Sequence, residues 1–256
     1  MDQYINFTGK VVVVTGGGSG MGTGIAECFA KAGADVVFTY CKHEAEAEKV
    51  AKMLEQYGHR VLGIKMDQRD VEQCRSAMRQ AKEAMGRLDV LVNNSGLHGG
   101  TPSLELDQEI WDTLLETNLR GQFFCSQAAA KIMIEQGEGG AIVSISSINA
   151  VNPLDNALHY GASKAGIEMT TRCLAKDLGR YGIRVNAIAP GLMDSPNLEL
   201  FVPGWKDRFV SRAPLGRPGE PEDIGNIAMF LSSPMSSWIT GQVIVADGGV
   251  TLAAAY

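Results

Sequence analysis

Tyr160 and Lys164 stand four residues apart in a segment, residues 159–181, whose composition predicts a helix. That spacing places both side chains on one face of the helix. A free phenol has a pKa of about 10 and is a poor base at neutral pH. A neighbouring ammonium group favours the phenolate, although a decrease of about 3 pKa units requires roughly 4 kcal/mol of differential stabilisation. The pair can then exchange a proton with an alcohol or a ketone, whereas Tyr-x-x-x-Lys by itself is also a commonplace surface pair.

A glycine-rich turn, residues 15–24, joins the apolar run 11–14 to a helical segment that begins near Ile25. Glycine accepts a positive φ and lets a phosphate approach the backbone. The helix that follows presents free N–H groups and the positive end of its dipole. Because the turn follows the first predicted strand, it favours a pyrophosphate ligand. The alternative is a tight turn between strand and helix that binds nothing.

Ser147 lies thirteen residues before Tyr160, just after the predicted strand 141–145. A hydroxyl at this place can hydrogen-bond the oxygen atom of a substrate. Ser146 is the alternative residue for that role.

These motifs resemble those of the short-chain dehydrogenases/reductases. Thr-Gly-x-x-x-Gly-x-Gly, from Thr15 to Gly22, is similar to the cofactor turn of the family, and Ser147 stands at the family's spacing before Tyr-x-x-x-Lys. The resemblance implies a catalytic tetrad of Asn118, Ser147, Tyr160 and Lys164. In the family, the asparagine of this tetrad helps to hold a water that links the lysine to solvent. An asparagine in the middle of a helix is otherwise unfavourable.

Matching segments cover nearly the whole chain, and by resemblance they imply a set of cofactor-binding residues. Residues 93–96 are similar to the family's Asn-Asn-Ala-Gly, with Ser95 in place of alanine. Asp67, expected to end the third strand, matches the aspartate that contacts the adenine edge. Ser195 stands where the family usually has threonine, and it keeps the hydroxyl group. The implied residues are Gly16, Ser19, Gly20, Met21, Gly22, Tyr40, Lys42, Asp67, Asn94, Tyr160, Lys164, Pro190, Gly191, Met193 and Ser195.

The end of the second predicted strand bears on the choice of nicotinamide cofactor. NAD-preferring enzymes place an acidic residue there to bind the ribose 2′-hydroxyl, and by resemblance that position is Tyr40. No carboxylate is present to repel a 2′-phosphate, and Lys42 and His43 could pair with one, which favours NADP(H) over NAD(H). Against this, Ser19 occupies a position where many NADP-dependent members carry a basic residue. Lys42 and His43 also suit an exposed helix start.

Seven short apolar runs alternate with longer helical stretches. The predicted strands are 11–14, 36–38, 61–64, 88–92, 141–145, 185–189 and 243–245, and the main predicted helices are 25–32, 44–57, 71–85, 111–134 and 159–181. The alternation predicts an α/β fold: a Rossmann fold with a doubly wound, seven-stranded parallel sheet and helices on both faces. We expect one domain, residues 1–256, with a substrate flap at about 191–218.

Composition limits the partners of the chain. Its 256 residues carry a formal net charge of −6, with a pI of about 5.3 and no basic stripe, so nucleic acid and anionic membranes are poor candidate partners. The N-terminus does not have the pattern of a signal peptide, and no apolar run approaches the roughly 18 residues of a membrane span. The five cysteines include no CxxC and the four histidines form no HxxxH pair. We therefore expect reduced thiols, no metal and a cytoplasmic protein.

The sequence predicts an NAD(P)-dependent oxidoreductase that interconverts a small secondary alcohol and a ketone, with Tyr160 as the acid/base. By resemblance we also expect a homo-oligomer, either a tetramer or a dimer.

Three alternatives stay open. A reductase of 3-oxoacyl groups on an acyl carrier protein would need a basic docking patch, for which Arg120, Arg172 and Arg180 are the candidates. A hydroxysteroid dehydrogenase would suit the apolar segment 198–209. A non-catalytic NADP-binding sensor or scaffold belongs to another class, and it has no need for Tyr160 and Lys164 together.

Overall fold

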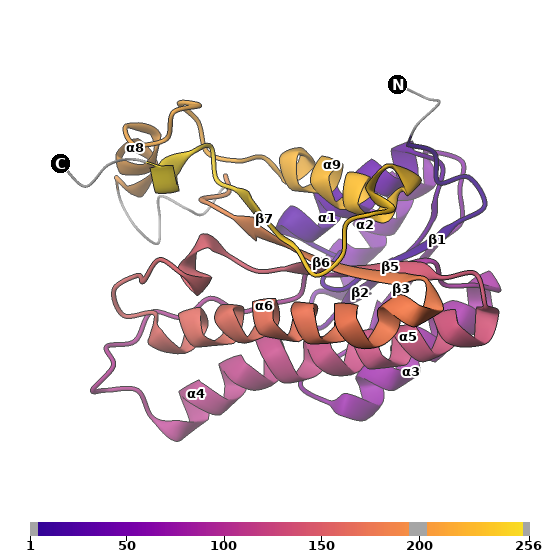
Figure 1. Ribbon diagram of the computed structural model, residues 1–256, viewed down its shortest axis with the longest axis horizontal. Helices are drawn as coiled ribbons and strands as arrows, with labels where there is room; N and C mark the ends of the chain where they lie inside the picture. Colours follow the sequence, from indigo (N-terminus) through magenta and orange to yellow (C-terminus); the bar gives the residue numbers. More distant parts are fainter. Residues whose placement is uncertain (1–4, 195–203, 253–256) are drawn as a thin grey trace.

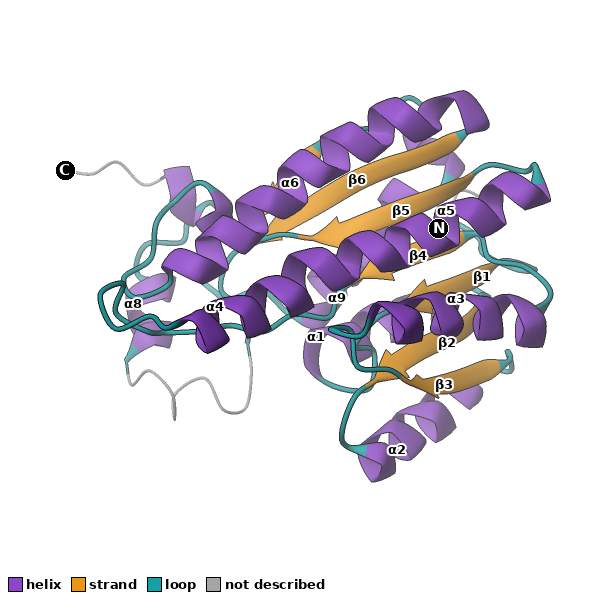
Figure 2. Ribbon diagram, turned by 90° about the horizontal axis from the view of Figure 1, so that it is seen from below, coloured by secondary structure: helices purple, strands orange, loops and turns teal. Residues whose placement is uncertain are grey.

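The computed structural model describes residues 5–194 and 204–252. Within these residues seven parallel strands form one sheet, in the order β3-β2-β1-β4-β5-β6-β7 (Figure 2). The strands are β1 (Val11–Val14), β2 (Asp35–Tyr40), β3 (Val61–Lys65), β4 (Val90–Asn93), β5 (Gly140–Ile145), β6 (Ile183–Pro190) and β7 (Val243–Ala246). The predicted fold class is confirmed, and each predicted strand is present with ends that differ by at most two residues.

Helices cover both faces of the sheet, as Figure 1 shows. One face carries α1 (Gly20–Lys31), α2 (Glu44–Glu55) and α9 (Pro221–Ser232), and the other carries α3 (Val71–Met85), α5 (Gln122–Gln136) and α6 (Leu158–Leu178). All four residues of β1 are fully buried between these layers. Complete burial on both faces explains why the central strands are continuous apolar runs without alternation.

Contrary to what the resemblance implied, Asp67 does not end the third strand. β3 ends at Lys65, so Asp67 lies in the loop after the strand and not on it. The backbone N–H of Asp67 donates to Gln73 Oε1 at 2.8 Å, and the Asp70 side chain accepts from the N–H groups of Glu72 and Gln73 at the start of α3. These bonds form the turn into the helix and draw the chain away from the sheet.

The helix predicted over 111–134 is interrupted. α4 (Gln108–Leu115) and α5 are joined by the π-helical segment Glu116–Gly121. A π-helical turn holds one residue more than an α-helical turn and is frequent at functional sites. Asn118 lies inside this segment, which accounts for an asparagine in the middle of a long helical run.

The predicted flap is described in part. Met193 forms an isolated parallel bridge with Gly219, and α8 (Trp205–Val210) follows the part that is not described. Lys206 Nζ on α8 lies 3.0 Å from Asp194 Oδ2. Ser195 and the apolar residues 198–202 lie outside the described residues.

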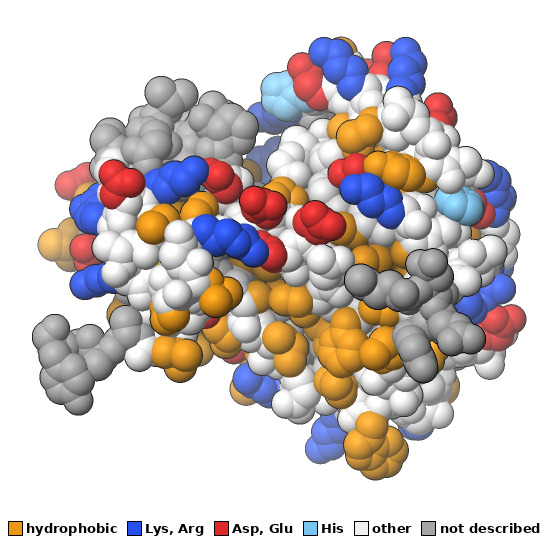
Figure 3. Space-filling model, turned by 90° about the horizontal axis from the view of Figure 1, so that it is seen from above, with side chains coloured by type: hydrophobic (Ala, Val, Ile, Leu, Met, Phe, Trp, Pro, Cys, Tyr) orange, Lys and Arg blue, Asp and Glu red, His pale blue; other side chains and the backbone are white. Residues whose placement is uncertain are grey.

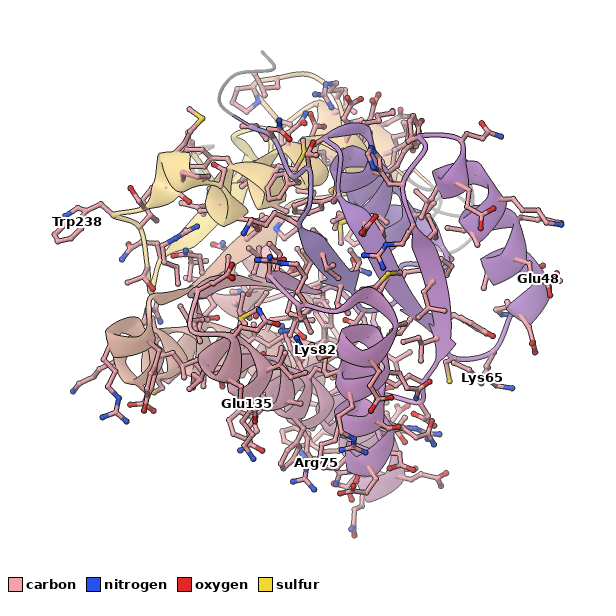
Figure 4. All side chains as sticks on the ribbon, turned by 90° about the vertical axis from the view of Figure 1, so that its right-hand side faces the viewer. Glu48, Lys65, Arg75, Lys82, Glu135 and Trp238 are labelled. Atoms are coloured by element: carbon pink, nitrogen blue, oxygen red, sulfur yellow. The ribbon has the colours of Figure 1, made fainter. Side chains whose placement is uncertain are left out.

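The surface shows no concentration of one charge on the face that α1 and α9 cover, where acidic and basic side chains are interspersed (Figure 3). Trp238 is 98% exposed and projects from the body of the molecule (Figure 4). Charged side chains such as Arg75 lie on the outer surface of α3 in the same view. In the part of the chain that the structure describes, no helix is both long and apolar enough to cross a membrane.

We expect Gly121→Ala to destabilise the protein, because the new Cβ would lie 2.0 Å from the backbone oxygen of Gln68. Overpacking of this kind costs about 1–3 kcal/mol. In a chain of this length each kcal/mol lowers Tm by roughly 2–4 °C. Thermal unfolding followed by circular dichroism measures the change.

Gly179→Ala is the matched control, because nothing lies within 4 Å of its added methyl group and Gly179 has α-helical dihedral angles. Its Tm should stay the same or rise. A Gly121→Ala protein as stable as this control would contradict the close approach.

Candidate active site

The four residues of the expected tetrad lie near the carboxyl ends of the central strands. Ser147 follows β5, Tyr160 and Lys164 lie in the first two turns of α6, and Asn118 lies in the buried π-helical segment. Ligands of doubly wound sheets bind at this edge, where the strand order reverses. In this sheet the reversal falls between β1 and β4.

Lys164 is enclosed by the protein. Its Nζ donates to the backbone oxygen of Ile145, the last residue of β5, at 2.9 Å, and lies 5.5 Å from the centre of the Tyr160 ring. Burial lowers the pKa of Lys164 to about 8 because the ammonium form loses hydration that one carbonyl does not replace. The lysine can therefore gain or lose a proton near neutral pH.

Burial raises the pKa of Tyr160, and hydrogen bonding with Ser147 lowers it to a smaller extent. From the sequence we expected Lys164 and a cofactor charge to lower this pKa. In the protein alone the charge of Lys164 is not among the causes of the shift, and Ser147 is the group that lowers the pKa of Tyr160.

The two candidate serines have different surroundings. Ser147 exchanges hydrogen bonds with Asn149, with its Oγ 3.1 Å from Asn149 Oδ1 and 3.1 Å from Asn149 N. Ser146 is buried, and its Oγ lies 3.3 Å from the backbone oxygen of Lys164 and 3.2 Å from Glu168 Oε1. The structure therefore brings Ser147 to the tyrosine and leaves Ser146 beneath α6.

The Asn118 side chain joins three parts of the site. Its Oδ1 accepts from the N–H of Leu97 at 2.7 Å, and its Nδ2 donates to the oxygen of Leu97 at 2.8 Å and to Ser163 Oγ at 3.1 Å. Both N–H donors are used, which leaves one lone pair on Oδ1. In the protein itself Asn118 fixes the loop after β4 against α6. The contact with a water that the resemblance implies for this side chain stays a prediction.

The glycine turn fits a dinucleotide. Gly16 and Gly20 have φ values of +64° and +54°, and a Cβ on Gly22 would lie 2.3 Å from the oxygen of Gly16. Nothing lies within 4 Å of the position that a Cβ on Gly20 would take. Ser19, the N-cap residue of α1, makes no side-chain cap hydrogen bond. The N–H groups of the first turn of the helix, including that of Met21, are therefore available to a pyrophosphate.

Asn94, the residue after β4, supports this turn. Its Nδ2 donates to the backbone oxygens of Thr15 and Gly16 at 3.0 and 3.2 Å, and its backbone N–H donates to Thr15 Oγ1 at 3.0 Å. A Cβ on Gly16 would lie 2.7 Å from Ser95 Oγ. The expected cofactor residues of β1, α1 and β4 thus lie together.

At the other end of the turn, Tyr40 ends β2 and its Cβ is 3.1 Å from the position of a Cβ on Gly18. Arg69 Nη2 lies 2.7 Å from Asp67 Oδ2. Hydrogen bonding from Arg69 is the main cause that lowers the pKa of Asp67, and the charge of Lys42 adds to it. Two cations therefore lie at the place expected for the adenosine end. Lys42 was expected from the sequence and Arg69 was not, although the spacing Asp-x-Arg after β3 could have indicated it.

The residues expected at the nicotinamide end lie at the end of β6. Pro190 is its last residue, and the N–H of Gly191 donates to the oxygen of Ala246 at 2.9 Å. A Cβ on Gly191 would lie 2.8 Å from Asp247 Cα. Met193 follows in the bridge to Gly219. The described residues contain no group of three or more His, Cys, Asp or Glu side chains that could hold a metal ion.

A second residue that the sequence argument missed is His98. The centre of its ring lies 4.6 Å from that of Tyr160, at an interplanar angle of 48°. The two residues are far apart in the chain and meet because α6 packs beside the loop after β4.

Comparison with known proteins places this geometry in a family. A family model described as enoyl-(acyl carrier protein) reductase matches residues 16–251. The chain is 34% identical to L-rhamnose 1-dehydrogenase (NAD(P)(+)) of Sphingomonas sp. (strain SKA58), over 94% of this chain and 96% of that protein. It is 35% identical to a 3-oxoacyl-(acyl-carrier-protein) reductase of Thermotoga maritima, over 95% of this chain and 98% of that protein.

Solved structures agree with the sequence matches. A candidate short-chain alcohol dehydrogenase from Sinorhizobium meliloti 1021 superposes with a TM-score of 0.94 at 40% identity, over 98% of this chain and 100% of that chain. An acetoin dehydrogenase from Enterobacter cloacae superposes with a TM-score of 0.89 at 34% identity, over 98% of each chain. The chain belongs to the short-chain dehydrogenase/reductase family.

Proposed function

We propose that the protein is an NAD(P)-dependent oxidoreductase that interconverts a secondary alcohol and a ketone, with Tyr160 as the acid/base. The observation that carries the proposal is the grouping of Tyr160, Ser147 and the buried Lys164 beside the glycine turn. Relatives named as rhamnose and acetoin dehydrogenases support this reaction class.

The protein groups divide the work of ketone reduction. The bound nicotinamide supplies the hydride. Ser147 and Tyr160 hold the carbonyl oxygen by hydrogen bonds, and Tyr160 donates its proton to that oxygen as negative charge develops there. The ammonium group of Lys164, 5.5 Å from the centre of the Tyr160 ring, returns a proton to the phenolate. Asn118 keeps the loop after β4 in place against α6.

For the cofactor we propose NADP(H) in preference to NAD(H). Lys42 and Arg69 supply two positive charges near the end of β2, where Tyr40 stands in place of the acidic residue of NAD-preferring enzymes. Part of the Arg69 charge is offset by Asp67.

We further propose that residues 191–218, which include α8, form a flap over the substrate. We also propose that the exposed Trp238 and Met235 belong to a contact within a homo-oligomer.

The second candidate is reduction of 3-oxoacyl groups on an acyl carrier protein, which the family description and the Thermotoga relative favour. The arginines of the described residues give little support to the basic docking patch that an acyl carrier protein would need. Arg120 pairs with Glu116 at 2.7 Å, and Arg172 lies 3.8 Å from Glu168. A 3-oxoacyl thioester therefore belongs in the substrate panel.

We expect Tyr160→Phe to reduce turnover by at least about 10²–10⁴-fold, the usual contribution of a positioned proton donor. Cofactor affinity should change little, because the phenyl ring keeps the shape of the site. Loss of NADPH or NADH absorbance with a panel of ketones measures turnover, and cofactor fluorescence measures binding.

Tyr181→Phe is the matched control, because Tyr181 is exposed at the end of α6 beside Arg180. It should keep wild-type turnover. A Tyr160→Phe protein that is as active as this control would contradict the proposed role. Cofactor binding without turnover of any ketone in the panel would favour the sensor.

We expect Lys42→Ala to raise KM for NADPH by about 5–10-fold, in keeping with the loss of one charge-assisted hydrogen bond to a phosphate. KM for NADH should change by less than about twofold, since NADH lacks the 2′-phosphate. Steady-state kinetics with both cofactors measure the difference.

Lys49→Ala removes an exposed charge from α2, the helix that follows Lys42, and serves as the control. An equal effect of Lys42→Ala on both cofactors would contradict a 2′-phosphate contact at this residue.

A further inference from the structure

The ring of Tyr160 touches one side chain that the proposed mechanism does not use, His98. Their ring centres are 4.6 Å apart. His98 is exposed, whereas Tyr160 is only half-buried. The imidazole therefore forms part of the surface that a substrate meets on its way to the Tyr160 hydroxyl.

The backbone on both sides of His98 is fixed. Asn118 holds the preceding residue, Leu97, through its N–H at 2.7 Å and its oxygen at 2.8 Å. The following residue, Gly99, lies against the fully buried His159, because a Cβ on Gly99 would be 2.4 Å from His159 Nε2. A side chain held in this way is suited to recognition, since little order has to be gained when a ligand binds.

The ring nitrogens of His98 are available to a ligand. Among residues 5–194 and 204–252 neither nitrogen makes a hydrogen bond or an ion pair. Partial loss of hydration lowers the pKa of His98 although the residue is exposed overall, and the charges of His159 and Lys164 lower it further, with no carboxylate among the causes. These causes favour the neutral ring, which has one N–H donor and one acceptor.

A neutral imidazole matches a hydroxyl group, which can also donate and accept a hydrogen bond. A carboxylate would use only the N–H and would favour a charged ring, which Lys164 and His159 oppose. The reacting oxygen already has two partners, the hydroxyls of Ser147 and Tyr160. A group next to the reacting carbon remains for His98.

We propose that His98 hydrogen-bonds a hydroxyl group on the carbon adjacent to the reacting carbonyl, so that the protein prefers α-hydroxy ketones and the matching vicinal diols to simple ketones. The inference rests on the proposed function, because it takes Tyr160 as the group that protonates the carbonyl oxygen. His98 is then a residue that determines specificity within that site.

The test uses pairs of ketones that differ by one hydroxyl group: 3-hydroxybutan-2-one with butan-2-one, and 2-hydroxycyclohexanone with cyclohexanone. For each pair the quantity measured is the ratio of the two kcat/KM values, with NADPH and with NADH. His98→Phe keeps an aromatic ring beside Tyr160 and loses the hydrogen bond. His98→Gln keeps a donor and an acceptor.

We expect the wild type to favour the hydroxy ketone of each pair. In His98→Phe the ratio should fall about tenfold, the effect of one hydrogen bond worth about 1.4 kcal/mol. In His98→Gln it should stay within about threefold of the wild type. Tm and cofactor affinity, measured on each variant, establish that the fold is intact.

Two results would overturn the inference. Equal losses on both members of a pair in His98→Phe would mean that the ring only covers Tyr160. A wild type that reduces the simple ketone as well as the hydroxy ketone would keep the proposed function and remove the role of His98. Failure of the proposed function differs from both, because turnover of the pairs would then be absent or would persist in Tyr160→Phe.

Discussion

The site depends on the burial of one charge-bearing side chain, Lys164. Its Nζ has the carbonyl of Ile145 as a hydrogen-bond partner, and no carboxylate pairs with it among the residues described. An ammonium group in such surroundings is costly, which is why its pKa falls to about 8. The fold accepts this cost at the carboxyl edge of the sheet, where β5 presents the carbonyl and α6 presents the lysine. Proteins commonly lose some folding stability at a functional site in this way, because the site needs a group that exchanges protons.

The same edge is held by close backbone contacts that only small residues permit. Gly96 lies between Asn118 and Lys164, since a Cβ there would be 3.3 Å from Asn118 Oδ1 and 3.6 Å from Lys164 Nζ. The asparagine in turn holds Leu97 and Ser163. The π-helical segment places the asparagine where it can reach both. These contacts together fix the positions of Lys164 and of the loop after β4. That loop in turn fixes the imidazole of His98 beside Tyr160.

Much of the fold was predictable from local patterns, whereas the finer features of the site were not. Runs such as 11–14 and 141–145 predicted buried parallel strands because apolar continuity reflects burial on both faces. The expected tetrad positions came from spacing and from resemblance, and their catalytic roles stay a prediction. The π-helical segment could not be predicted, since no local residue pattern in 116–121 distinguishes a π-helical turn from an α-helical one. The contact between His98 and Tyr160 depends on packing between distant segments, and the different surroundings of Ser146 and Ser147 depend on which way two adjacent side chains point.

The most direct test of this account is the thermal stability of Lys164→Met as a function of pH. The pKa of Lys164 is about 8 in the folded protein, against an ordinary value of 10.5. The unfolded chain therefore binds the proton more tightly than the folded protein does. Burial of the charged lysine lowers the stability of the folded protein, and this loss of stability is complete below pH 8. A shift of this size is worth about 3 kcal/mol, and the lost bond to Ile145 offsets about 1 kcal/mol. The account predicts a variant that is more stable than the wild type at pH 7, by about 4–8 °C in Tm, with a difference that narrows as the pH rises from 8 to 10. A variant that is less stable at pH 7, or a difference that does not depend on pH, would contradict it.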